Sequence, residues 1–149
     1  KECWVLGDNV TVTGDTSTIA MLVSPNTPTP VPPPSWAGDY VALCSGFATD
    51  PEKNAMTVNV TIYQTGNQIK TNFVCYGFNV QIIATVSPDG MFASGEMQYG
   101  YNGYVVRLAR VASNLNQFQG KFYAANNPGY DGAFCGGTKG SSYPSPCRP

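Results

Sequence analysis

The residues of this chain best suited to chemistry are its five cysteines, Cys3, Cys44, Cys75, Cys135 and Cys147. The chain contains no histidine and its cysteines show no CxxC spacing, so the usual ligand sets for zinc and haem are missing. Disulfide bonds formed in an oxidising compartment are the better interpretation. Because five is an odd number, at least one cysteine is unpaired or bonds another chain. We expect no metal ion and no cofactor.

Side chains that could act in catalysis are equally sparse. Without histidine, the Ser-His-Asp and Cys-His arrangements of nucleophilic catalysis are excluded. Two carboxylates can act together as an acid and a base. However, Glu96 falls in a predicted strand near Arg107, and Asp50 and Glu52 fall in a loop beside Lys53, so we interpret them as ion-paired or solvated surface. We predict no catalytic residues and a protein that is not an enzyme.

Two further groups of side chains are suited to binding or modification. Tyr99, Tyr101 and Tyr104 each combine an apolar ring with a polar tip, so they could line a surface for a ligand or a sugar. Core filling and subunit contact are the alternatives. Asn9-Val10-Thr11 and Asn59-Val60-Thr61 match the acceptor pattern for N-glycosylation, with chance matching as the alternative. Asn59 falls on the polar face of a predicted strand, where it could carry a glycan.

Length and composition bound the class of protein. The 149 residues suffice for one domain with one core. Charged residues make up 11% of the chain and the net charge is -1, which gives no electrostatic footprint for nucleic acid or an anionic membrane. No apolar run reaches the ~18 residues that a membrane-spanning helix needs. The opening Lys1-Glu2-Cys3 resembles a mature chain whose leader has been removed.

Strands of even spacing fill the chain after Trp36. Met56–Gln64 alternates apolar and polar residues with period 2, which predicts a half-buried strand. Hairpin turns and similar runs predict eight strands in all, at Gly38–Cys44, Met56–Gln64, Gln68–Cys75, Phe78–Val86, Met91–Tyr99, from Tyr104, at Phe118–Ala124 and at Ala133–Cys135. No helical period interrupts them. We predict an all-β domain, an up-and-down barrel or a coiled sandwich of antiparallel strands.

The turns set the expected register. A Gly66-Asn67 turn places Val60 opposite Phe73 and Val58 opposite Cys75, which keeps apolar residues on one face. An Asn102-Gly103 turn pairs Tyr101 with Tyr104, Tyr99 with Val106 and Met97 with Leu108, and makes Glu96 and Arg107 diagonal neighbours. The segment "WAGDY", Trp36–Tyr40, resembles the first strand of lipocalin-like and avidin-like barrels, and the rest of either family's pattern is absent.

The alternating strand directions place the cysteines. Cys44 and Cys75 end strands that run the same way, so they meet at one end of the sheet and can form a disulfide. Cys135 and Cys147 can close the C-terminal tail into a short loop near Trp36. Cys3 is left over. It could pair with another subunit, stay a buried thiol, or replace a partner in one of these bridges.

The chain before Trp36 predicts a β-forming arm, residues 1–24, and a Pro-rich linker, residues 25–35, ahead of the domain at 36–149. Candidate strands at Asn9–Thr13 and Thr18–Val23 could make only a marginal hairpin alone, so the arm must pack on a partner. The linker favours an extended polyproline II spacer of ~3.1 Å per residue. Trp36 is expected to anchor its end against the base of the barrel. The residues expected in intersubunit contact are Cys3, Trp4, Ile19, Met21 and Val23.

Two functions fit these features. The first is a non-enzymatic, secreted structural subunit that assembles with copies of itself into a filament, each arm adding a strand to a neighbour. A closed barrel has no free edge to receive a strand, so this hypothesis needs an opening between strands. The alternative is a secreted or surface-tethered barrel that binds a small ligand or glycan. A pocket in the barrel mouth favours the alternative, and a filled interior counts against it.

Overall fold

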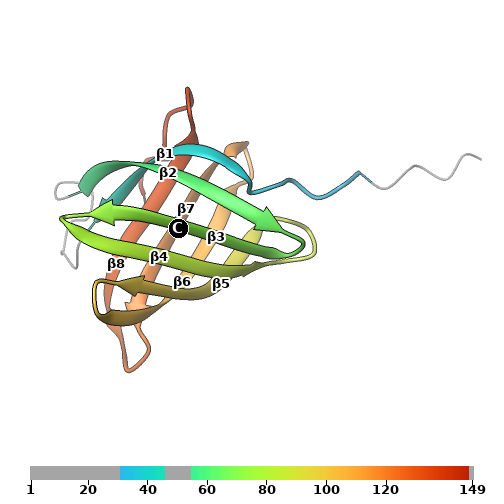
Figure 1. The fold of residues 1–149 in the computed structure, drawn as a ribbon. Coiled ribbons are helices and arrows are strands. Elements are labelled where there is room, and N and C mark those ends of the chain that lie inside the picture. Colours follow the sequence, from blue (N-terminus) through green and yellow to red (C-terminus); the bar gives the residue numbers. More distant parts are fainter. Residues whose placement is uncertain (1–30, 46–54, 148–149) are drawn as a thin grey trace, which may run out of the picture. The chain divides into compact units, whose positions relative to one another are not determined.

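Eight antiparallel strands close into a barrel in the computed structural model, which describes residues 31–45 and 55–147, with the backbone alone over 128–131. The strands are β1 Gly38–Ser45, β2 Ala55–Thr65, β3 Gln68–Cys75, β4 Phe78–Val86, β5 Phe92–Tyr99, β6 Asn102–Val111, β7 Asn114–Ala124 and β8 Asn127–Thr138. Each pairs with its neighbour in the sequence, and β8 pairs with β1 (Figure 1). The predicted all-β class is confirmed, and of the two predicted arrangements the barrel is the one that forms.

The side chains on the inner face of the strands fill the barrel. On β2, Val58, Val60 and Ile62 are buried. Thr57 and Asn59, on the alternate positions, are exposed, as the alternation predicted. Met56, which was expected on the inner face, is exposed because it lies at the rim, one residue into the strand. The largest side chains that are completely buried are Trp36, Phe118, Phe122, Phe134, Ile62, Ile69, Ile82 and Met97.

Glycines on β8 make room for the large rings. A Cβ atom added at Gly132 would lie 2.3 Å from Cζ of Phe122, and one at Gly136 would lie 2.8 Å from Cε1 of Phe118. Both distances are far below van der Waals contact, so the phenylalanines occupy the space that side chains on β8 would otherwise take. Large residues on β7 and small ones on β8 therefore fit together as one packed layer.

The Gly66-Asn67 turn forms as predicted, with Thr65 opposite Gln68 and Gly66 at φ +59°. The pairing of β2 with β3 then ends at Tyr63 and Lys70. The expected register, with Val60 opposite Phe73 and Val58 opposite Cys75, is the one that these pairs follow, but the ladder ends before it reaches those four buried residues. Beyond Tyr63 and Lys70 the two strands form no ladder pairs.

The hairpin of β5 and β6 turns two residues earlier than predicted. Tyr99 pairs with Asn102 and Met97 with Tyr104, so the turn is Gly100-Tyr101. Gly100 takes φ +60° at the first central position, as a type II′ turn requires, and this turn wins over Asn102-Gly103. Tyr101 therefore lies at the tip, completely exposed, and not on the inner face.

Because the shift is an even number of residues, every other predicted face on this hairpin is retained. Ser94 pairs with Arg107 and Glu96 with Val105. Glu96 and Arg107 are therefore diagonal neighbours on the outer face, as predicted.

Both predicted disulfides are confirmed, Cys44 to Cys75 and Cys135 to Cys147. Cys135 pairs across the sheet with Leu43, near the end of β1 that is remote from Trp36, because β8 continues to Thr138 before the tail turns back. The expectation that this bridge lies near Trp36 is therefore wrong. Cys147 packs on the outer face of the barrel in a small cluster with Leu43, Ala133 and Cys135.

The two bridges should differ in what they contribute to stability. The Cys44–Cys75 bridge closes 31 residues and the Cys135–Cys147 bridge closes 12. The loop-entropy relation gives about 3.7 and about 2.8 kcal/mol respectively. We expect the Cys44→Ala/Cys75→Ala variant to lose more free energy of unfolding in urea than the Cys135→Ala/Cys147→Ala variant. Equal or reversed losses would show that the outer cluster under the tail matters more than the crosslink across the barrel.

Candidate functional site

Trp36 fixes the end of the Pro-rich linker against the base of the barrel. Its side chain is completely buried, and its indole Nε1–H donates to the carbonyl oxygen of Gly90 at 2.8 Å. Its backbone N–H donates to Oε1 of Gln64 at 2.7 Å, and its carbonyl accepts from the hydroxyl of Tyr40 at 3.0 Å. The predicted anchoring role of Trp36 is confirmed.

Arg110, on β6, covers the Trp36 ring from inside the barrel. The guanidinium carbon lies 4.6 Å from the ring centroid, close enough for a cation–π interaction in a buried site. The same guanidinium donates to the backbone carbonyls of Ser35 and Leu115 and to the hydroxyl of Tyr40. Among the described residues, its Nε–H meets no hydrogen-bond acceptor. Arg110 thus ties the linker, β1 and the start of β7 into one cluster.

The linker residues before Trp36 pack on the turn between β4 and β5. A Cβ atom at Gly90 would lie 2.9 Å from Cδ of Pro34 and 3.1 Å from Cβ of Pro33, and Gly90 has φ +73°. Only glycine allows both this conformation and this close contact. The linker therefore contacts the barrel from Pro33 to Trp36, where Pro34 is half-buried and Trp36 is buried, while Pro32 and Pro33 are exposed.

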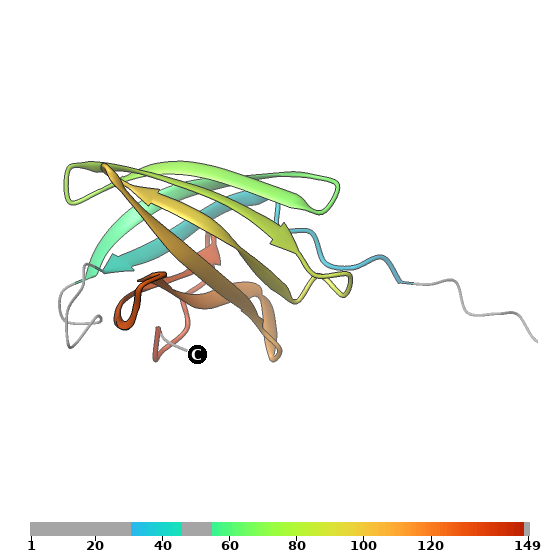
Figure 2. The same cartoon turned by 90° about the horizontal axis from the view of Figure 1, so that it is seen from below.

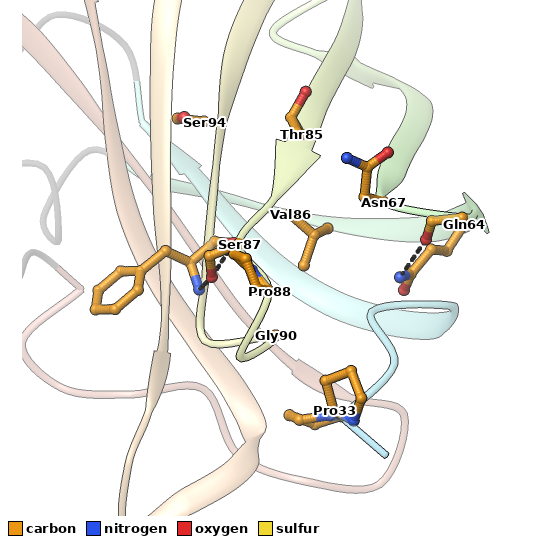
Figure 3. Close-up of a pocket in the computed structure, with 12 residues that line it drawn as sticks. Pro33, Gln64, Asn67, Thr85, Val86, Ser87, Pro88, Gly90 and Ser94 are labelled. Carbon is orange, nitrogen blue, oxygen red and sulfur yellow. Dashed lines mark hydrogen bonds between the residues drawn. The ribbon is translucent and has the colours of Figure 1, made fainter.

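A surface hollow of about 620 Å³ lies beside the anchored linker (Figure 3). In this view Gln64 and Asn67 line its right side, Ser87 and Pro88 lie near its centre, and Pro33 lies below. Val86, Pro34 and the exposed ring of Phe92 add apolar walls. Amides, a hydroxyl and apolar side chains in one open hollow suit an extended peptide segment.

The turn at Ser87–Gly90, with the sequence SPDG, is held by a carboxylate. Oδ1 of Asp89 accepts hydrogen bonds from the hydroxyl of Ser87 and from the backbone N–H of Met91, the latter at 3.0 Å. These two bonds, the Ser87 bond first, hold the pKa of the Asp89 carboxyl below its ordinary value of 3.8. The charged carboxylate thereby supports the turn whose carbonyl receives the Trp36 indole.

The three candidate tyrosines do not form one binding surface. Tyr99 and Tyr104 are partly buried and pack on the ring of Phe122, with centroids 6.2 and 5.9 Å away. Burial, followed by the nearby Tyr76 and Tyr104, raises the pKa of Tyr99, whose hydroxyl donates to the carbonyl of Cys75 at 3.2 Å. Tyr99 and Tyr104 therefore fill the end of the core remote from Trp36. Of the three tyrosines, only Tyr101 is fully exposed.

The remaining predicted residues separate into two groups. Asn59 is exposed on the outer face of β2, as expected, and Thr61 of its acceptor triplet donates to Asp39 at 2.7 Å. The other residues lie outside the described part of the chain, namely Cys3, Trp4, Asn9, Ile19, Met21 and Val23, as do the predicted arm strands and most of the linker.

Sequence reasoning missed Arg110. A signal was present, because Tyr104, Val106 and Leu108 alternate on the inner face and Arg110 is the next residue of that series. A charged residue at an inner position of a strand calls for a buried partner. The partner, Trp36, is 74 residues earlier in the chain, so local pattern gave no sign of it.

Comparisons with known proteins add no relative. No protein-family model matches the chain, and no curated protein matches it. Within residues 31–45 and 55–147, the structure contains no helix long and apolar enough to cross a membrane. The same residues hold no group of three side chains from His, Cys, Asp and Glu that could bind a metal ion.

Two arginines three residues apart on β6 test the role of the buried cluster. Arg110→Lys keeps the charge but loses the planar donors and most of the stacking on Trp36, so we expect a loss of about 2–3 kcal/mol in the free energy of unfolding. Arg107→Lys, on the exposed outer face, should change it by no more than about 0.5 kcal/mol. Urea denaturation of both variants measures this. Equal losses would contradict the structural role of Arg110.

A pH series tests the turn. Because the folded pKa of Asp89 is lowered, its stabilisation is complete above its ordinary value of 3.8 and is lost as the pH falls through the lowered pKa. We expect the wild-type protein to be more stable than Asp89→Asn at pH 6, and the two stability curves to converge as the pH falls below 3.8 and through the lowered pKa. A difference that stays constant over the whole range would contradict this account.

Proposed function

We propose that this protein is a non-enzymatic, extracellular structural subunit that assembles with copies of itself through residues 1–24. The observation that carries the proposal is the anchored linker. Trp36, Arg110 and Gly90 hold the chain from Pro33 to Trp36 in one position, so the Pro-rich segment that precedes Pro33 has a fixed end from which to extend. A flexible tether would need no such clamp.

The filled barrel weakens the alternative of a ligand held inside. Buried aromatic and aliphatic side chains occupy the interior, from Trp36 at one end to Phe122 and Tyr99 at the other. The hollow beside the linker lies on the outer surface of the barrel. A further outer hollow, of about 560 Å³, is lined by amide side chains of Asn72, Asn79, Gln81 and Gln98. An exterior surface is where a structural subunit makes its contacts.

The two internal disulfides support an oxidising environment, and an extracellular location follows as part of the proposal. Four cysteines are used within the domain, which leaves Cys3 for a bond between subunits. Asn59, exposed on β2, is available as a glycan attachment point in the same compartment.

The arm supplies the association chemistry in this proposal. Ile19, Met21 and Val23 alternate with Thr18, Ala20 and Leu22, so an extended arm presents one strongly apolar face. Strand addition joins such a segment to a neighbour by main-chain hydrogen bonds, with the apolar face supplying specificity. A head-to-tail contact of this kind does not close, and so it builds a filament.

Size measurement of the full chain tests the proposal. We expect concentration-dependent assemblies by light scattering and filaments by electron microscopy. Ile19→Asp/Met21→Asp should abolish them, because two charges would be buried at the contact. Ser17→Asp, a charge placed just before the predicted strand, is the matched control and should still assemble.

The Cys3→Ser variant tests separately whether a disulfide bond links the subunits. If Cys3 joins subunits, that variant should lose the dimer band on non-reducing gels. A clean monomer of the wild-type chain over the whole concentration range would refute self-assembly and favour the binding module.

A further inference from the structure

The barrel wall has its fewest ladder pairs between β2 and β3. Three residue pairs join β2 to β3, from Thr65–Gln68 to Tyr63–Lys70, whereas eight join β3 to β4 and eight join β1 to β2. Yet β2 has 11 residues and β3 has 8. In the described part of the chain, the stretches Met56–Ile62 and Thr71–Cys75 therefore face each other without ladder pairs. We call this region the β2–β3 opening.

The Cys44–Cys75 disulfide helps explain the opening. In a regular sheet β1 and β3 are two strand spacings apart, about 9.5 Å. The Cα atoms of Cys44 and Cys75 are only 6.4 Å apart. The end of β3 therefore lies closer to β1 than in a regular sheet, and the pairs of β2 with β3 stop five residues before it, at Lys70. We infer that the bridge helps to hold β3 where the edge of β2 has no ladder partner.

A side chain marks where the ladder stops. The hydroxyl of Thr71 donates to the carbonyl oxygen of Thr61 at 2.8 Å. In an antiparallel ladder that carbonyl would accept from a backbone N–H, so a side chain has taken the place of the next ladder bond. It also shows that the backbone polar groups of Thr61 point toward β3.

Alternation then identifies the unpaired groups. Because every second residue points its N–H and C=O the same way, Thr57 and Asn59 also point theirs toward β3, while Val58 and Val60 point toward β1. On β3 the backbone N–H and C=O groups of Asn72 and Val74 point toward β2, as those of Lys70 do. The opening is thus bordered on each side by main-chain donors and acceptors that belong to no ladder pair.

The core beneath the opening is apolar and slightly accessible. Val58 on β2 and Phe73 on β3 keep 7% and 8% of their surface exposed, whereas Ile62, Ile69 and Ile82 keep 2% or less. An added strand would cover this surface with every second side chain. Main-chain groups on both sides and an apolar floor are the features that a β-strand recognises.

We propose that the β2–β3 opening is the acceptor site for residues Thr18–Val23 of a second copy of this chain. The inference rests on the proposed self-assembly and names the surface that receives the arm. The segment carries no charge, and an extended strand of six residues spans about 20 Å, roughly the length of Met56–Ile62. Ile19, Met21 and Val23 would lie over Val58 and Phe73.

The position of the linker favours a second copy over the chain's own arm. The opening runs from Ile62 and Thr71 to Met56 and Cys75, at the end of the barrel remote from Trp36. Figure 1 shows the described linker residues leaving the barrel at the other end, where β1 begins, and leading away from the wall. Figure 2, from below, shows the same departure. The described linker residues therefore lead away from the opening, which favours an arm from a second copy as its occupant.

Hydrogen exchange on the full chain tests the site residue by residue. In dilute monomer, the amides of Thr57, Asn59 and Val74 should exchange quickly, and those of Val58 and Val60, which face β1, should be protected. On assembly the first three should slow by on the order of a hundredfold or more, and the two controls should not change.

Each outcome decides a separate point. Assembly without protection of Thr57, Asn59 and Val74 would overturn the acceptor site and leave the proposed function standing. Protection already in the monomer would show that the chain's own arm fills the opening, and would overturn the exchange between copies. Absence of any assembly would refute the proposed function and this inference together.

Matched substitutions give an independent test. Val74 and Ile83 are apolar residues on the outer faces of β3 and β4, 52% and 38% exposed. Lysine at a strand edge opposes strand addition. We expect Val74→Lys to raise the concentration needed for assembly by about tenfold or more, and Ile83→Lys, whose strand is paired on both sides, to change it less than about twofold. Circular dichroism checks that both variants fold, and equal effects would overturn the proposal.

Discussion

The contact between the Arg110 guanidinium and the Trp36 indole is the interaction on which the base of this barrel depends. Trp36 precedes the first strand and Arg110 lies on the sixth, so their stacking closes the end of the barrel across its whole width. A buried guanidinium is costly unless it is satisfied, and here carbonyls, a phenol and a π face provide that satisfaction. The same contact fixes the linker, so stability and any role of the N-terminal arm share one anchor.

The packing of the interior determines where function can lie. Phe118 and Phe122 take the room left by glycines on β8, and Tyr99 and Tyr104 close the layer above them. With so many aromatic side chains inside a barrel of eight strands, the described interior is a core and the outer surface is left for recognition. The hollow beside Pro33 and the β2–β3 opening are two of the places where that surface departs from a smooth wall.

The opening shows how a closed barrel can still offer strand edges. Closure normally removes every edge, which protects a β-protein from uncontrolled association. Here the crosslink between Cys44 and Cys75 draws the end of β3 toward β1, the ladder between β2 and β3 ends at Tyr63 and Lys70, and Thr71 follows it with a side-chain bond. The unpaired stretch is short and flanked by complete ladders, so an association there would be confined to a partner of matching length.

The sequence by itself determined the strands, their faces and the disulfides, because period 2, turn residues and the direction of successive hairpins are local or nearly local properties. Even the misplaced turn at Asn102-Gly103 kept the faces of Tyr99 and Tyr104, since the true turn is shifted by two residues. Only the tertiary structure decided the Trp36–Arg110 contact, the exposed Tyr101 and the end of the β2–β3 ladder. Each depends on how the sheet curls and closes, which brings together residues far apart in the chain.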